Sequence, residues 1–151
     1  MGCLICDRID MIRRGTNPYY VAELETGYVV IGDHQRFKGY TLFLCKEHVT
    51  ELHFLPTEFK LQHLKEMSLV GEAVYNVFKP EKLNIEALGN GDAHLHWHLF
   101  PRVTGDTPVK GPVWLLPYEE LFSDANRPKE EELESMKHDL RAEIERLLQK
   151  S

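Results

Sequence analysis

The residues best suited to chemistry are three histidines that alternate with apolar residues in one short run: His94, Leu95, His96, Trp97, His98 and Leu99. Side chains of a β-strand point to opposite faces in turn, so the histidines should share one face and the apolar residues the other. Imidazole can serve as a nucleophile, a hydrogen-bond donor or a metal ligand near neutral pH. The run therefore predicts a strand with a reactive ridge on one face and a buried core on the other.

The spacing of these histidines limits what they can do together. On a strand, neighbouring histidines have Cα atoms about 6.6 Å apart, and the outer two are about 13 Å apart. One metal ion can bridge neighbours but not comfortably all three, so we expect unequal roles. One histidine would react, while the others hold a metal, a substrate or a tautomer.

The elements that must position this strand follow from apolar periodicity and turn residues. Strands are expected at residues 19–24, 28–33, 40–45, 83–88 and 94–100. A long amphipathic helix is expected between Pro56 and Lys79, and a Gly-rich turn at 89–92 precedes the histidine run. Residues 103–127 should form a loop, and 128–151 a C-terminal helix with an apolar stripe. The pattern predicts an α+β fold with an antiparallel sheet, one long inserted helix and a C-terminal helix.

The composition is that of one globular domain spanning residues 1–151. The chain carries 18 basic and 24 acidic residues, and it has no long basic cluster, which argues against a non-specific nucleic-acid binder. No apolar stretch approaches the roughly 20 residues of a membrane span, and the first residues lack the apolar core of a signal peptide. We therefore expect a cytoplasmic protein whose three cysteines are thiols or metal ligands rather than disulfides.

The histidine pattern, followed by Pro101 and Arg102, resembles the defining motif of the histidine triad (HIT) family. The likeness extends to an N-terminal Cys-x-x-Cys pair, a Lys-Glu-His-Val segment at 46–49 and the helix after it, which fall in the family's order. The resemblance implies an α+β fold, a two-fold homodimer, and activity as a nucleotide hydrolase or nucleotidyl transferase.

The resemblance assigns catalytic roles to two histidines. The central one, His96, would be the nucleophile, forming a phosphoramidate that water later cleaves. His98 would donate a hydrogen bond to the same phosphate, helped by backbone N–H groups of residues 89–93 and, more weakly, by Arg102. A backbone carbonyl must hold the tautomer of the nucleophile, and the sequence does not say which one.

Substrate-binding residues are expected in three places. The turn before the first histidine lacks the Gly-Gln pair of many family members, and Asn90 and Gly91 are predicted to contact the substrate there. A turn role alone, in which Asn90 merely adopts a positive φ, is the alternative. Asp33 falls where the family binds ribose, and a carboxylate can accept from both hydroxyls. The adenine pocket is expected to be lined by Leu4, Ile5 and Ile31.

A structural Zn²⁺ is also implied by the resemblance, with Cys3, Cys6, His48 and His94 as ligands, and no organic cofactor is expected. Two sulfurs and two nitrogens suit tetrahedral zinc. Cys45 leaves an alternative open, because Cys45-x-x-His48 also has ligand spacing and could replace His94. The metal would fix the N-terminus to the histidine strand.

The predicted function is a nucleotide hydrolase or nucleotidyl transferase that acts on dinucleoside polyphosphates or nucleoside phosphoramidates through a covalent nucleotidyl-histidine. Two other classes stay open: a nucleotide-binding sensor or interaction protein without significant turnover, and an enzyme that uses His-x-His as catalytic metal ligands. The expected partner is a small-molecule nucleotide, with no nucleic-acid polymer and no membrane.

Overall fold

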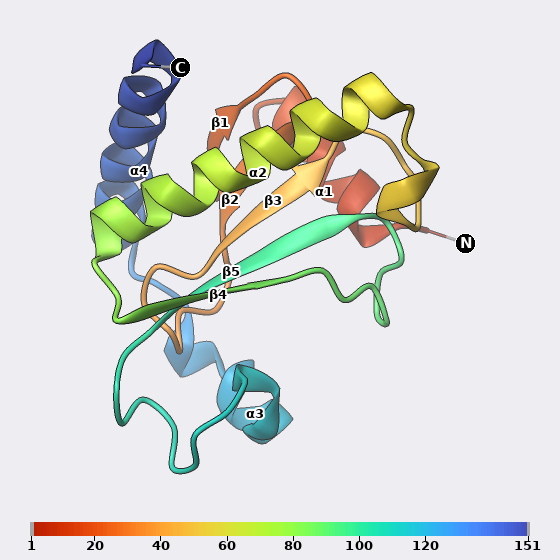
Figure 1. Ribbon diagram of the computed structural model, residues 1–151. Coiled ribbons are helices and arrows are strands. Elements are labelled where there is room, and N and C mark those ends of the chain that lie inside the picture. Colours follow the sequence, from red (N-terminus) through yellow and green to blue (C-terminus); the bar gives the residue numbers. More distant parts are fainter. Residues whose placement is uncertain (1, 151) are drawn as a thin grey trace.

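The computed structural model describes residues 2–150. The first and last residues of the predicted domain, 1 and 151, lie outside this range. Its centre is a five-stranded antiparallel sheet of order β1-β2-β3-β5-β4 (Figure 1). The strands are β1 Tyr20–Glu23, β2 Gly27–Ile31, β3 Thr41–Cys45, β4 Lys82–Glu86 and β5 His96–Arg102. The predicted α+β fold, with its antiparallel sheet, inserted helix and C-terminal helix, is confirmed.

Two long helices pack on one face of the sheet (Figure 1). The first, α2 (Thr57–Phe78), follows the short η1 (Leu52–Phe54) between β3 and β4, and α4 (Glu130–Lys150) lies at the other end of the chain. The predicted apolar stripe of α4 is buried: Leu133, Met136, Leu140, Ile144 and Leu147. These side chains share one core with sheet residues such as Phe43 and Trp97.

The histidine strand begins later than the sequence predicts. β5 starts at His96, so His94 lies just before it, while the three apolar residues of the run face the α2–α4 core as predicted. His96 and His98 therefore project from the opposite face. There they are paired in register with Leu44 and Leu42 of β3.

A helix that the sequence analysis did not predict, α1 (Leu4–Arg13), covers part of this second face. Cys3 caps it, because its sulfur accepts from the backbone N–H of Cys6 at 3.3 Å. Ile5 and Ile9 are buried against side chains of β2 and β3. The helix thereby brings the N-terminal cysteines close to the start of β5.

The segment 103–127, expected to be a loop, packs beside the other end of β5. It contains three short helical elements: η2 Val113–Leu115, α3 Tyr118–Leu121 and η3 Asp124–Asn126. Its apolar side chains, among them the fully buried Val113, pack on Phe37 and Phe100. None of the helices within residues 2–150 has the length and apolar character needed to cross a membrane.

A buried chain of hydrogen bonds lies behind β5, on the α2 side. The indole Nε1 of Trp97 donates to Nε2 of His63 at 3.0 Å, and Nδ1 of the same imidazole lies 2.9 Å from the hydroxyl of Thr26. That hydroxyl donates to a carboxylate oxygen of Glu66 at 2.5 Å, so the imidazole must donate from Nδ1. Burial lowers the pKa of His63 to about 4, and the ring is neutral at pH 7.

Candidate active site and metal centre

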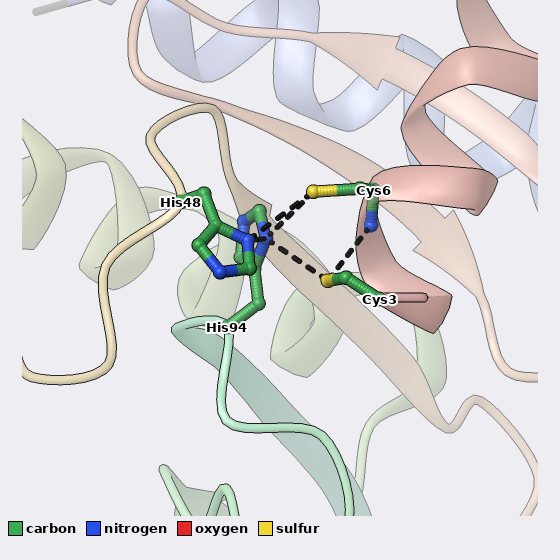
Figure 2. Close-up of side chains that lie close together, drawn as sticks. All are labelled: Cys3, Cys6, His48 and His94. Atoms are coloured by element: carbon green, nitrogen blue, oxygen red, sulfur yellow. Dashed lines mark hydrogen bonds between the residues drawn. The ribbon is translucent and has the colours of Figure 1, made fainter. Parts of the chain in front are cut away.

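The predicted metal ligands lie together at the N-terminal end of α1 (Figure 2). The sulfurs of Cys3 and Cys6 and one ring nitrogen each of His48 and His94 all lie within 4.8 Å of one another. Nδ1 of His94 is 3.5 and 3.4 Å from the two sulfurs and 3.1 Å from Nδ1 of His48. The donor atoms of tetrahedral zinc lie about 3.3–3.8 Å apart, given its usual bond lengths. The three separations at His94 lie in or just below this range.

The hydrogen bonds of His94 leave its ring ready for a metal. Its Nε2 donates to the carbonyl oxygen of Cys45 at 2.7 Å, which puts a lone pair on Nδ1, the atom that faces the sulfurs. The thiol of Cys45 is buried in the core and does not belong to the ligand group. Of the two ligand sets that the sequence leaves open, the structure assembles the one with His94.

Without a metal, burial keeps Cys6 and His94 of this group in their uncharged forms. Burial, together with the neighbouring Cys3, raises the pKa of the Cys6 thiol to about 11. Burial lowers the pKa of His94, which keeps the imidazole in the neutral form that binds metals. A bound cation would supply the positive charge that holds the sulfurs as thiolates.

His96 is held by a main-chain atom of the residue beside it in the histidine run. Its Nδ1 lies 2.7 Å from the carbonyl oxygen of His94, and a carbonyl can only accept, so Nδ1 carries a proton. Nε2 is then the basic nitrogen, and His96 lines a cavity over this face of the sheet. The sequence predicts that a carbonyl sets this tautomer, and the structure identifies it as that of His94.

His98 is held by a residue that the sequence analysis did not single out. The hydroxyl of Tyr40 lies 2.7 Å from Nδ1 of His98, and its ring stacks on Phe100 with centroids 4.0 Å apart. Gly32 leaves room for this ring, since a Cβ there would collide with it. Burial, followed by the electrostatic effect of the nearby His96 imidazole, lowers the pKa of His98 to about 4. The imidazole is therefore neutral at pH 7.

The direction of this hydrogen bond follows from the state of Tyr40. Burial and the carboxylates of Asp33 and Glu86 raise the pKa of Tyr40, so the phenol keeps its proton. Among residues 2–150, Nδ1 of His98 is its only hydrogen-bond acceptor, so the phenol donates there. The proton of His98 is then on Nε2, where it can be offered to a ligand.

A cavity of about 320 Å³ opens beside the two histidines. Its apolar lining consists of Leu4 and Ile5 of α1, Val30 of β2, and Leu42 and Leu44 of β3. His34 and Phe122, which meet edge to face with centroids 5.5 Å apart, also line it. The prediction for Ile31 is wrong, because this neighbour of Val30 points to the α2–α4 core. An apolar cavity with a few polar groups suits a flat aromatic ligand.

Asp33 lines the cavity, and it is already paired. Arg8 of α1 donates to both of its carboxylate oxygens, at 3.3 and 2.8 Å. Each carboxylate oxygen has a second lone pair, so Asp33 can still accept from a hydroxyl group of a ligand.

The structure does not bring every predicted site residue to the cavity. Asn90 and Gly91 are exposed on the turn before β5, and of that turn only Asp92 lines the cavity. Asn90 does not have the positive φ that its alternative turn role requires. Arg102 is held outside the cavity by a two-bond ion pair with Asp106, at 2.8 and 2.9 Å.

The sequence analysis missed several cavity residues, among them three that shape its polar and aromatic lining: Arg8, Tyr40 and Phe122. Ile5, Ile9 and Ile12 recur at helical spacing, a signal that could have revealed α1 and hence Arg8. Nothing local marks the other two, because their positions depend on contacts between distant parts of the chain.

Comparison with known proteins gives a consistent result. The sequence model of the HIT domain family matches residues 19–105. A solved histidine triad protein from Bradyrhizobium japonicum is 26% identical, with a TM-score of 0.71, over 83% of this chain and 89% of that one. Another from Marinobacter aquaeolei VT8 is 27% identical, with a TM-score of 0.71, over 85% and 89%. A Zn-bound histidine triad family protein from Mycobacterium smegmatis shares the fold at 21% identity, with a TM-score of 0.68, over 100% and 99%. No curated protein sequence matches the chain.

Proposed function

This chain belongs to the HIT domain family, and from that premise we propose that it binds nucleotides and transfers or hydrolyses a nucleotidyl group through a covalent bond to His96. The proposed substrates are dinucleoside polyphosphates or nucleoside phosphoramidates. One observation carries the proposal: the 2.7 Å contact between Nδ1 of His96 and the carbonyl of His94 leaves the lone pair on Nε2 at a residue that lines the cavity.

In the first half of the reaction, the Nε2 lone pair of His96 forms a bond to phosphorus. The bond from phosphorus to the leaving group breaks, and its electron pair goes to the leaving atom, which takes a proton from water. The imidazolium keeps its Nδ1 proton, and the carbonyl of His94 stabilises it by accepting that hydrogen bond.

In the second half, water attacks the phosphorus of the nucleotidyl-histidine and releases a proton to solvent. The bond between phosphorus and His96 breaks and returns its electron pair to Nε2. His98 donates from Nε2 to the phosphate oxygens and stabilises their negative charge in both halves. Asn90, Gly91 and the N–H groups of their turn are proposed to add donors when a substrate is bound.

The nucleoside part of the substrate would occupy the apolar cavity. Its base would lie on Val30, Leu42 and Leu44, with Leu4 and Ile5 of α1 against it. Asp33 would accept from the ribose hydroxyls while Arg8 holds the carboxylate in place.

Cys3, Cys6, His48 and His94 are proposed to hold a structural Zn²⁺, which supplies a cross-link between α1 and the start of β5. We also propose a homodimer, because two-fold dimers are the commonest soluble oligomers. A cytoplasmic location is proposed because free thiols suit a reducing compartment.

The test of the proposed function is mass spectrometry of the intact protein, quenched without acid after mixing with diadenosine tetraphosphate or an adenosine 5′-phosphoramidate. We expect a nucleotidyl adduct on the wild type that His96→Ala does not form. The matched control is His53→Ala, which removes an exposed histidine outside the cavity and should keep the adduct. Tight nucleotide binding with neither adduct nor product would overturn the catalytic proposal and indicate a protein that only binds nucleotides.

A further inference from the structure

Glu86 is an acidic residue beside the histidine face for which the proposed function has no role. It ends β4 and is paired directly with His98 of β5. Residues paired in this way project from the same face, with Cβ atoms about 5 Å apart. Glu86 therefore lies next to His98, on the side away from β3.

The carboxylate of Glu86 has unused hydrogen-bonding capacity. Its Oε1 accepts from the indole N–H of Trp114 at 2.7 Å, and the Trp114 ring meets His98 edge to face, with centroids 5.6 Å apart. Its Oε2 is buried without a hydrogen-bond partner, the one such side-chain atom among residues 2–150. A buried polar atom without a partner is unfavourable, so this oxygen can gain from a donor on a ligand.

The order of the strands tells which part of a substrate meets Glu86. The apolar floor of the cavity belongs to β2 and β3 and the two histidines to β5, while Glu86 of β4 lies beside His98, outside the cavity lining. If the nucleoside lies on this floor and the phosphorus lies at the histidines, the nucleoside occupies the β2–β3 side of the site. The β4 side, and Glu86 with it, is left for the leaving group.

Glu86 takes part in no salt bridge among residues 2–150, although its charge, after that of Asp106, contributes to raising the pKa of Arg102. Arg8 and Arg102 are each held in a two-bond ion pair, with Asp33 and Asp106 respectively. His98 is neutral at pH 7. A leaving group made of phosphates would bring negative charge to a carboxylate, whereas an amine leaves as a neutral N–H donor that can take up a further proton from water and become positively charged.

We propose that Glu86 recognises the leaving group and selects an amine over a phosphate chain, so that nucleoside phosphoramidates are the preferred substrates. The inference rests on the proposed nucleotidyl transfer to His96 and narrows its substrate class. Trp114, which is 37% exposed, is the present donor to this carboxylate and can give up its place to the N–H of an amine.

The test compares the wild type with Glu86→Gln on two substrates that share adenosine and its 5′-phosphorus. One is the adenosine 5′-phosphoramidate of a primary alkylamine, and the other is diadenosine tetraphosphate. Glutamine keeps an oxygen for the Trp114 N–H and removes the charge. We expect kcat/KM to fall about tenfold for the phosphoramidate and to rise about tenfold for the tetraphosphate, because one nearby unit charge is removed.

The matched control is Glu81→Gln, which removes an acidic residue just before β4 that accepts from the N–H of Thr104 at 3.2 Å. This substitution should leave kcat/KM unchanged for both substrates. Glu86→Ala should shift the ratio of the two values in the same direction as Glu86→Gln, so the conclusion does not depend on one variant. An unchanged ratio in both Glu86 variants overturns the role of Glu86 and leaves the proposed function standing. Absence of turnover and of adduct in the wild type on both substrates overturns the proposed function, and this inference with it.

Discussion

The hydroxyl of Tyr40 donates to Nδ1 of His98 over 2.7 Å, so a residue just before β3 decides which nitrogen of a β5 histidine carries the proton. Burial keeps this imidazole neutral by lowering its pKa to about 4. His98 is thereby suited to act as a neutral hydrogen-bond donor, and not as a charged acid, at pH 7.

Tyr40→Phe should slow catalysis with little effect on substrate binding. The variant keeps the ring that stacks on Phe100 and loses only the hydroxyl. We expect kcat to fall by about ten- to a hundredfold, as for other residues that orient a functional side chain through a hydrogen bond without contacting the substrate. Nitrogen-15 NMR should find the His98 proton on Nε2 in the wild type and a mixture of the Nε2–H and Nδ1–H tautomers in the variant. Tyr20→Phe on β1 is the control, and an unchanged His98 spectrum in Tyr40→Phe would refute the argument.

Asp33→Asn should weaken binding through the ribose. The substitution removes one acceptor and the charge that Arg8 pairs with. We expect KM for an adenosine nucleotide to rise about tenfold, and KM for its 2′,3′-dideoxy analogue to rise much less. Steady-state kinetics on the two analogues make the comparison within one variant. An equal rise for both would mean that Asp33 acts only through the shape of the cavity wall.

Removal of a metal ligand should loosen the N-terminus. Cys6→Ser is expected to weaken Zn²⁺ binding by about tenfold or more and to lower the melting temperature, because binding is coupled to docking of α1. Elemental analysis and thermal melting, with and without a chelator, measure both effects. Cys45→Ala, which removes a thiol outside the ligand group, should retain the metal. Loss of zinc in that control would restore the alternative ligand set with Cys45.

The free energy of unfolding should fall as the pH drops from about 6.5 to 4, in part because of His63. Its pKa of about 4 in the folded protein lies below its usual 6.5, so the unfolded chain binds more protons in this window. This contribution is fully present above pH 6.5, and about 2–4 kcal/mol of it is lost on acidification. Urea denaturation across the window should give a shallower fall for His63→Gln, whose amide can serve both Trp97 and Thr26. Parallel curves for the two proteins would exclude His63 as the source.

The sheet face of the histidines could be predicted because strand side chains alternate regardless of the rest of the molecule. Local periodicity in the same way correctly predicted that the apolar stripe of α4, from Leu133 to Leu147, is buried. The contact between Tyr40 and His98 could not be predicted, since it joins residues 58 positions apart and leaves no periodic trace. For α1, the apolar stripe is confined to a helix of 10 residues whose first part also has metal-ligand spacing. Local sequence patterns were thus enough to locate the reactive histidines, whereas the groups that orient them could be identified only in the folded structure.

The restraint on His96 is made by the main chain of His94, and every amino acid has a carbonyl group. No substitution at position 94 can delete that acceptor, but it would remove the imidazole whose contacts fix the backbone there. Its geometry changes when the backbone before β5 moves, and the imidazole of His94 ties that backbone to His48, the Cys3–Cys6 turn and the carbonyl of Cys45. Variants that alter the reactivity of the nucleophile should therefore be sought among these neighbours, several residues away from any phosphate.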